Sequence, residues 1–231
     1  MFAIFVYEFE WSSIAVAIPL LWRGAAITLE ITLTAVVFGI LWGTVLAVAR
    51  LSPVAIIAKP AAAYVNLFRS IPFVMVILWF FLIVPQAISA LFGGVTGDIR
   101  LTSSLIAFSL FQAAYYSEVI RAGIQSVPKG QAQAGMALGM SNMRVLMLVV
   151  LPQAFRNMVP LLLTQTIILF QDTSLVYVIS ATDFLGAASK IANRDYRLVE
   201  MYTFVAVVYF VISFGLSTLV KNLQARIAVI R

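Results

Sequence analysis

The sequence predicts an all-α membrane protein with about five transmembrane helices. Of its 231 residues, 63% are hydrophobic, and the mean hydropathy is +1.05. A soluble domain averages roughly 45–50% apolar residues, so this excess needs a lipid-facing coat. The apolar residues form runs of about 20, the length that crosses a bilayer as a helix. No hydrophilic block is long enough to fold separately, which predicts one membrane domain.

Basic, Pro and Gly residues separate the apolar runs. The five predicted spans cover residues 25–49, 72–92, 101–119, 161–179 and 201–220. Residues 52–68 are apolar but interrupted by prolines and a lysine, so we interpret them as an interfacial or re-entrant stretch. Pro72 disfavours helix at the residue before it and predicts a break there. Residues 93–98 are rich in Gly and predict a loop.

The distribution of Lys and Arg predicts the orientation. When the connections are assigned alternately to the two sides, ten of the fifteen basic residues fall on one side, and most acidic residues fall on the other. Cytoplasmic loops carry the excess of Lys and Arg, so we expect the N-terminus outside and the C-terminus in the cytoplasm. The ten are Arg50, Lys59, Arg69, Arg121, Lys129, Arg144, Arg156, Lys221, Arg226 and Arg231.

The residue inventory excludes several kinds of chemistry. The chain has no Cys and no His, which removes disulfides, thiolate metal sites, thiol nucleophiles and imidazole bases. It contains no GxxxxGK[ST] phosphate loop, so we expect no ATP bound by this chain. The net charge of +6 would suggest nucleic acid in a soluble protein, but here the basic residues flank apolar runs. We therefore expect no catalytic residues, no metal site and no nucleic-acid partner.

The connection between the third and fourth spans, residues 121–157, is the most informative polar stretch. Residues 131–138 are rich in Ala and predict a helix. Gly139 ends or bends that helix, Ser141 or Asn142 caps a second short helix, and Pro152 stops or kinks the second one. We expect a compact helix–turn–helix on the cytoplasmic face. The residues alone favour an ordinary loop equally.

This stretch resembles the signature loop of ABC importer permeases, E-A-A-x3-G-x9-I-x-L-P. The resemblance implies a type I ABC importer permease fold in which residues 130–151 include a coupling helix that sits in a groove of an ATPase subunit. Gln replaces the Glu and Gly replaces the second Ala of the pattern, which puts in doubt any ion pair of that Glu. The residues carried over to coupling are Gly130, Gln133, Ala134, Gly135, Gly139, Leu151 and Pro152.

Further stretches are similar to the polar amino-acid branch of these permeases, and together the match covers roughly residues 24–220. They include residues 68–72, 114–118, 120–130 and 151–154, and residues 169–178 resemble permeases that import glutamate and aspartate. The resemblance implies the bacterial inner membrane, a segment 1–23 outside, a transmembrane domain 24–220 with its coupling loop at about 129–152, and a cytoplasmic tail 221–231.

The resemblance also implies partners. They are a second permease, two ATPase subunits that carry ATP and Mg, and a periplasmic amino-acid-binding protein. Because this branch often pairs two distinct permeases, we expect a heterodimer, with a homodimer as the alternative. The cargo alternatives are glutamine, histidine, arginine and cystine, and an ion-coupled secondary transporter is a more distant rival.

Polar groups inside a membrane usually face a pathway or a partner. An acidic amino acid needs cationic or hydroxyl donors for its carboxylates and an acceptor for its ammonium. Each candidate also has a structural interpretation: Glu118 and Arg121 are three residues apart and pair with each other, and Arg69 reaches lipid phosphate. It also remains open whether this subunit has a cargo site at all. The pathway candidates are Arg69, Ser70, Tyr115, Tyr116, Ser117, Glu118, Gln171, Asp172, Thr173 and Ser174.

Overall fold

A computed structural model describes residues 9–93 and 97–227, which are helical throughout apart from short connections. The elements are α1 (Ser12–Leu51), α2 (Ala55–Ser70), α3 (Phe73–Phe92), α4 (Ile99–Gln125), α5 (Lys129–Ala137), α6 (Asn142–Val145), the π-helical turn η1 (Leu146–Val150), α7 (Leu151–Asp172), the 3-10 segment η2 (Thr173–Ile179), α8 (Phe184–Asp195) and α9 (Leu198–Ile227). The described part thus confirms the predicted all-α class.

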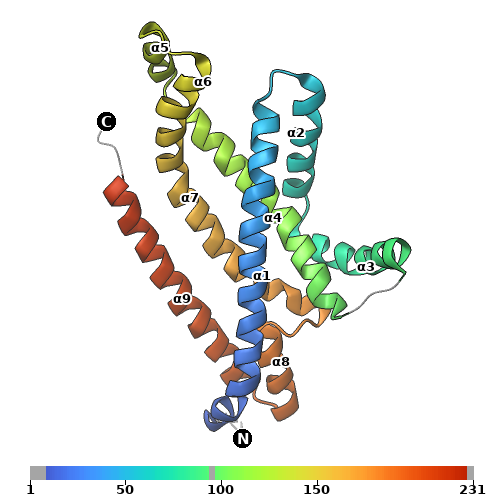
Figure 1. Ribbon diagram of the computed structural model, residues 1–231. Helices are drawn as coiled ribbons and strands as arrows, with labels where there is room; N and C mark the ends of the chain where they lie inside the picture. The colour runs from blue at the N-terminus through green and yellow to red at the C-terminus, as the bar shows by residue number, and fades with distance from the viewer. Residues whose placement is uncertain (1–8, 94–96, 228–231) are drawn as a thin grey trace, which may run out of the picture.

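Within the described residues, four helical segments are long and apolar enough to cross a membrane: Ser12–Leu51, Phe73–Leu91, Asn142–Ile179 and Leu198–Arg226. The fifth long helix, α4, packs against α1, α2, α3 and α7. It lies across α1 near the middle of the bundle (Figure 1). Contact with protein rather than lipid explains why α4 tolerates buried polar residues such as Gln112 and Ser117. The helix count therefore agrees roughly with the predicted five spans.

The first helix starts much earlier than the predicted span. α1 begins at Ser12 rather than at residue 25, contains Pro19, and has 40 residues. At 1.5 Å per residue it is about 60 Å long, roughly twice the thickness of the hydrocarbon core. It is therefore longer than a crossing of the hydrocarbon core requires, and near its start Leu21 packs with Phe184 and Ile191 of α8 in a small core of their own.

The break at Pro72 is confirmed, and the stretch before it is a regular helix. α2 ends at Ser70, Ile71 is extended, and Pro72 precedes the first residue of α3. The interfacial or re-entrant interpretation of residues 52–68 thus corresponds to α2, which packs on α1 and α4. The predicted loop at residues 93–98 begins at Gly93, which is left-handed with φ 74°, but its residues 94–96 lie outside the described residues.

The fourth span also starts earlier than predicted. α6, η1 and α7 follow one another without a break from Asn142, so Pro152 does not end the second short helix. The helix continues through Pro152 because a π-helical turn precedes this proline, in which the N–H of Leu151 donates to the carbonyl of Leu146. This wider turn takes up the irregularity that a proline without an N–H introduces.

The two ends of the described chain lie at opposite ends of the bundle. The start of α1 lies beside α8, whereas α9 runs back toward the end from which α5 and α6 project (Figure 1). This placement agrees with the odd number of spans predicted from the sequence. The assignment of these ends to the outside and the cytoplasm remains a prediction, and its parts that concern residues 1–8 and 228–231 lie outside the described residues.

Candidate functional site

The first candidate site is the helical loop formed by α5 and α6. Gly139 has φ 79°, in the left-handed region, and lies in the turn after α5. The hydroxyl of Ser141 accepts a hydrogen bond from the N–H of Arg144 and caps α6. Gly135 is buried, and a Cβ there would lie 3.0 Å from a methyl carbon of Val145. The helix–turn–helix predicted for this loop is confirmed, and small residues hold its two arms together.

Large apolar side chains are exposed on this loop and on the η1 turn that follows it. Leu138 is 84% exposed, Met143 65% and Leu148 67%. Exposed apolar side chains on a part that projects from the bundle are typical of a contact with another protein. Gly135 is buried and Leu151 partly buried, so both serve packing. The remaining residues predicted for coupling are exposed: Gly130, Gln133, Ala134, Gly139 and Pro152.

The second candidate site is a cavity of about 420 Å³ where α2, α3, α4 and α7 meet. Its wall combines a cation, a carboxylate, hydroxyl and amide groups with apolar and aromatic side chains, the composition that suits a small polar solute. Four of the predicted pathway residues line it: Arg69, Ser70, Tyr115 and Asp172. The cavity is also lined by Ile71, Pro72, Phe73, Phe111, Gln165 and Ile168.

Arg69 occupies the wall of this cavity near the end of α2. Its guanidinium lies over the ring of Tyr115, 5.7 Å from the ring centre, an arrangement that attracts a cation to the aromatic face. Its Nη1 is 3.7 Å from Oε2 of Glu118, and 42% of its side chain is exposed. The side chain is therefore held in place on two sides while its donors remain accessible.

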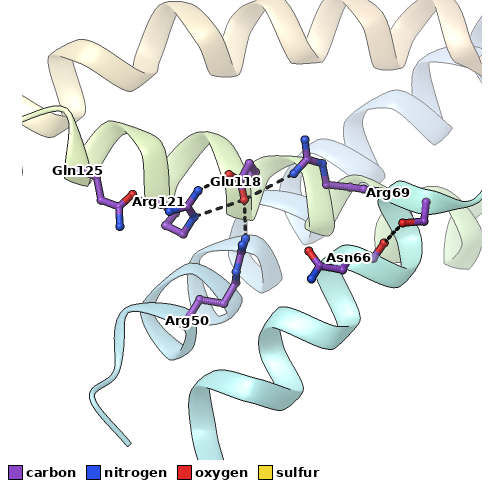
Figure 2. Close-up of polar contacts among 7 residues, drawn as sticks. Arg50, Asn66, Arg69, Glu118, Arg121 and Gln125 are labelled. Carbon is purple, nitrogen blue, oxygen red and sulfur yellow. Dashed lines mark hydrogen bonds and ion pairs between the residues drawn. The ribbon is translucent and has the colours of Figure 1, made fainter. Parts of the chain in front are cut away.

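Glu118 gathers three guanidinium groups from three helices (Figure 2). Arg50 at the end of α1 donates to its Oε2 at 2.6 Å. Arg121, one turn along α4, donates to its Oε1, which confirms the predicted pair of Glu118 and Arg121. Because one carboxylate serves three cations, the cluster keeps an excess of positive charge beside the cavity.

Residues 35–229 match the protein family described as binding-protein-dependent transport system inner membrane component. The chain belongs to this family. The glutamate/aspartate import permease protein GltK of Escherichia coli O157:H7 is 59% identical over 96% of this chain and 100% of its own length. The glutamine transport system permease protein GlnP of Escherichia coli K12 is 31% identical over 96% of this chain and 100% of its own.

Solved structures share the fold of this permease. A chain of an amino acid ABC transporter crystallised with histidines superposes with a TM-score of 0.85 at 30% identity, and the match covers 95% of this chain and 100% of that one. A chain of the methionine ABC transporter MetNI in an inward-facing conformation gives a TM-score of 0.68 at 23% identity, with 88% and 96% covered. The type I importer permease fold expected from the sequence is confirmed, and the secondary-transporter alternative is set aside.

Several predicted pathway residues of the permease lie elsewhere. Tyr116 is buried against α1, and its hydroxyl hydrogen-bonds Thr166 at 2.9 Å. Ser117 is buried on the same side of α4. The hydroxyls of Thr173 and Ser174 donate to carbonyls of their own helical turns at 2.7 and 2.8 Å. Gln171 is exposed but does not line the cavity. These five residues do not line the cavity, and their assignment to the substrate pathway stays a prediction.

The sequence reasoning missed the polar wall that α7 contributes through Gln165. Its Nε2 donates to Oε1 of the buried Gln112 at 3.0 Å, and the amide nitrogen of Gln112 has no hydrogen-bond partner among the described residues. A glutamine four residues after Leu161 in an apolar span was a usable signal, because polar groups inside a membrane face a pathway or a partner. Phe73 and Phe111, whose rings stack 4.0 Å apart, carried no such signal.

Proposed function

We propose that this permease forms part of the translocation pathway for glutamate and aspartate in an ABC importer of the bacterial inner membrane. The observation that carries the proposal is the 59% identity to a glutamate/aspartate import permease over 96% of the chain. Relatives named for glutamine and cystine transport are 29–35% identical. Those cargoes are the alternative, and they would use the same machine.

The chemistry of the cavity supports an amino-acid cargo. Arg69 presents guanidinium donors to a carboxylate, and the exposed side chain of Arg69 lets a solute reach them. Asp172 on α7 lines the same cavity and supplies an acceptor for the cargo's ammonium. The excess of guanidinium groups around Glu118 favours a net anion over a cation, which suits glutamate and aspartate better than arginine or histidine.

The assembly we propose contains this permease, a second permease subunit, two ATPase subunits that bind ATP and Mg, and a periplasmic amino-acid-binding protein. The N-terminus lies outside and the C-terminus in the cytoplasm, which places α5 and α6 on the cytoplasmic side. The exposed apolar surface of Leu138, Met143 and Leu148 supports an ATPase contact there. We expect the second permease to be a distinct chain, with a second copy of this one as the alternative.

The mechanism is alternating access, and this chain performs no chemistry itself. ATP brings the two ATPases together, α5 moves with them, and the attached helices tilt so that the cavity opens outward. The binding protein then delivers its amino acid, and ATP hydrolysis returns the cavity to the inside. Because α4 leads into α5 and α7 follows η1, two of the four helices that wall the cavity connect to the moving loop.

The test is uptake of labelled glutamate by the full importer in proteoliposomes, with the binding protein outside and ATP inside. We expect ATP-dependent uptake that excess aspartate inhibits and excess arginine or histidine does not. Asp172→Asn and Arg69→Gln are expected to reduce uptake at least about tenfold, the effect of losing one charged hydrogen bond of about 1.5–3 kcal/mol. Arg194→Gln, which removes an exposed ion pair to Asp195 at the far end, is the control.

Two results would overturn this proposal in different ways. Uptake of glutamine or cystine but not glutamate would leave the permease assignment and replace the cargo. Full uptake by the Asp172 and Arg69 variants, at matched amounts of assembled complex, would remove the cavity from the pathway and leave cargo selection to the binding protein and the sister permease.

A further inference from the structure

A continuous series of polar contacts runs from the cavity wall to the last turn of α4 (Figure 2). It starts at Arg69, whose Nη1 lies 3.7 Å from Oε2 of Glu118. Glu118 is hydrogen-bonded by Arg121, and Nη1 of Arg121 donates to Oε1 of Gln125 at 2.6 Å. Gln125 is the last residue of α4, and α5 begins four positions later at Lys129.

The strengths of these contacts differ along the series. The contact of Arg69 with Glu118 is the longest, and the Arg69 side chain is 42% exposed, so solvent and a passing solute compete for it. The side chains of Arg121 and Glu118 are only 25% and 24% exposed, and they are directly hydrogen-bonded. The carboxylate of Glu118 is also held by Arg50 at 2.6 Å. Arg69 is therefore the member that exchanges partners most easily.

The last residue of the series, Gln125, is joined to α5 of the coupling loop by three residues that make their own contacts. Ser126, which follows Gln125, accepts a hydrogen bond from Asn157 of α7 at 2.8 Å and donates to the carbonyl of Gly123 at 2.7 Å. Val127 is buried, and Pro128 has a fixed backbone immediately before α5. Because these three residues have little freedom to move independently, a shift in the position of Gln125 is passed on to the start of α5.

We propose that Arg69, Glu118, Arg121 and Gln125 form a relay that reports the occupancy of the cavity to α5. This inference rests on the proposed function. A cargo carboxylate takes Arg69 away from Glu118, so Glu118 is shared by Arg50 and Arg121 alone. Its contact with Arg121 then strengthens, the hydrogen bond between Arg121 and Gln125 changes with it, and the orientation of α5 that favours ATP hydrolysis is stabilised. Glu118, Arg121 and Gln125 are positioning residues that do not touch the cargo.

Gln125 offers the sharpest test, because it is exposed and lies outside both the cavity and the coupling surface. In the reconstituted importer, ATP hydrolysis is measured without cargo and with glutamate-loaded binding protein. We expect Gln125→Ala to leave basal hydrolysis unchanged and to reduce the stimulation by cargo about three- to tenfold, the range of coupling carried by such networks. Gln125→Glu keeps an acceptor for Arg121 and should retain the stimulation.

The control is Gln86→Ala, an exposed glutamine on α3 whose side chain bonds only the carbonyl of Leu82 in its own helix among the described residues. Wild-type stimulation in Gln125→Ala would overturn the relay, as would equal loss in Gln125→Ala and Gln125→Glu. A wild-type importer that glutamate-loaded binding protein does not stimulate would instead contradict the proposed function. The two failures are thus distinguishable in one experiment.

Discussion

Gly24 of α1 lies directly against the backbone of Asp183, the residue that precedes α8. A Cβ on Gly24 would be 2.6 Å from the carbonyl oxygen of Asp183 and 2.8 Å from Cβ of Ala187. Four residues along α1, the hydroxyl of Thr28 accepts a hydrogen bond from the N–H of Phe184 at 3.0 Å. α8 is therefore fixed on α1 by close backbone contact as well as by apolar packing.

Gly24→Ala should destabilise the permease by about 1–3 kcal/mol, because the clash is with backbone atoms that have no alternative rotamer. Thermal unfolding in detergent measures the effect. Gly215→Ala in α9, where a Cβ meets no atom of the described residues within 4 Å, is the matched control and should not lower the unfolding midpoint, because Ala favours a helix more than Gly does. Equal midpoints for both variants would contradict the close contact of α1 with α8.

Asp183 predicts a pH dependence of stability. Burial raises the pKa of Asp183 to about 6, although the N–H groups of Gly186 and Leu185 donate to its carboxylate and oppose the rise. The unfolded chain releases this proton near pH 3.9, so the folded state binds more protons between about pH 4 and 6. Stability contributed by this group is therefore present at low pH and is lost as the pH rises through about 6.

Asp183→Asn isolates this effect, because Asn caps a helix about as well as Asp and does not titrate. We expect the unfolding free energy of the wild type, relative to Asp183→Asn, to fall by on the order of 2 kcal/mol between pH 4 and 7. A difference that is constant over this range, or that increases with pH, would show that Asp183 is not titrating as its burial predicts.

Arg50→Ala should destabilise the bundle, because it takes away one of the hydrogen bonds to Glu118 at the junction of α1 and α4. Both side chains are largely covered, at 14% and 24% exposed, so the expected loss is about 1.5–3 kcal/mol. Arg194→Ala, which breaks the exposed pair with Asp195, should have no measurable effect on thermal unfolding. Comparable losses in the two variants would show that the burial of the Arg50–Glu118 pair does not increase its contribution to stability.

Much of the local structure could be predicted from sequence, because it depends on a few residues with strong backbone preferences. Pro72 predicted the break between α2 and α3, Gly139 the turn after α5, and Ser141 the cap of α6. The pairing of Glu118 with Arg121 followed from helical spacing. The predicted starts of the first and fourth spans were wrong. Hydropathy marks the length of chain that crosses lipid, and it carries no information on how far the helix continues beyond that length.

The cavity was only partly predictable. Arg69 and Asp172 were found because charges are costly in a membrane. Phe111 and Gln165 come from other helices, and only the packing of α4 on α3 and α7 brings them to the same wall. Tyr115 lines the cavity and its neighbour Tyr116 does not, because successive residues on a helix point in different directions.

Gly139→Leu should weaken the contact with the ATPase. Among the described residues, and apart from its two chain neighbours, no atom lies within 4 Å of a Cβ at this position, so the effect comes from the left-handed backbone, where a side chain costs about 1–2 kcal/mol. We expect up to about tenfold less ATPase co-purified with the tagged permease, and a matching loss of uptake. Gly139→Asn is the control, because Asn tolerates this conformation. Normal assembly and uptake by Gly139→Leu would contradict the role of this loop in coupling.

The side of the membrane on which α5 lies is the most direct test of the account. The chain has no cysteine, so single cysteines can be placed at Leu138, which is 84% exposed in the coupling loop, and at Tyr196, which is 83% exposed at the opposite end. A membrane-impermeant maleimide should label Tyr196→Cys in intact spheroplasts and Leu138→Cys only in inside-out vesicles stripped of ATPase. Labelling of Leu138→Cys from the outside would contradict coupling of this loop to a cytoplasmic motor.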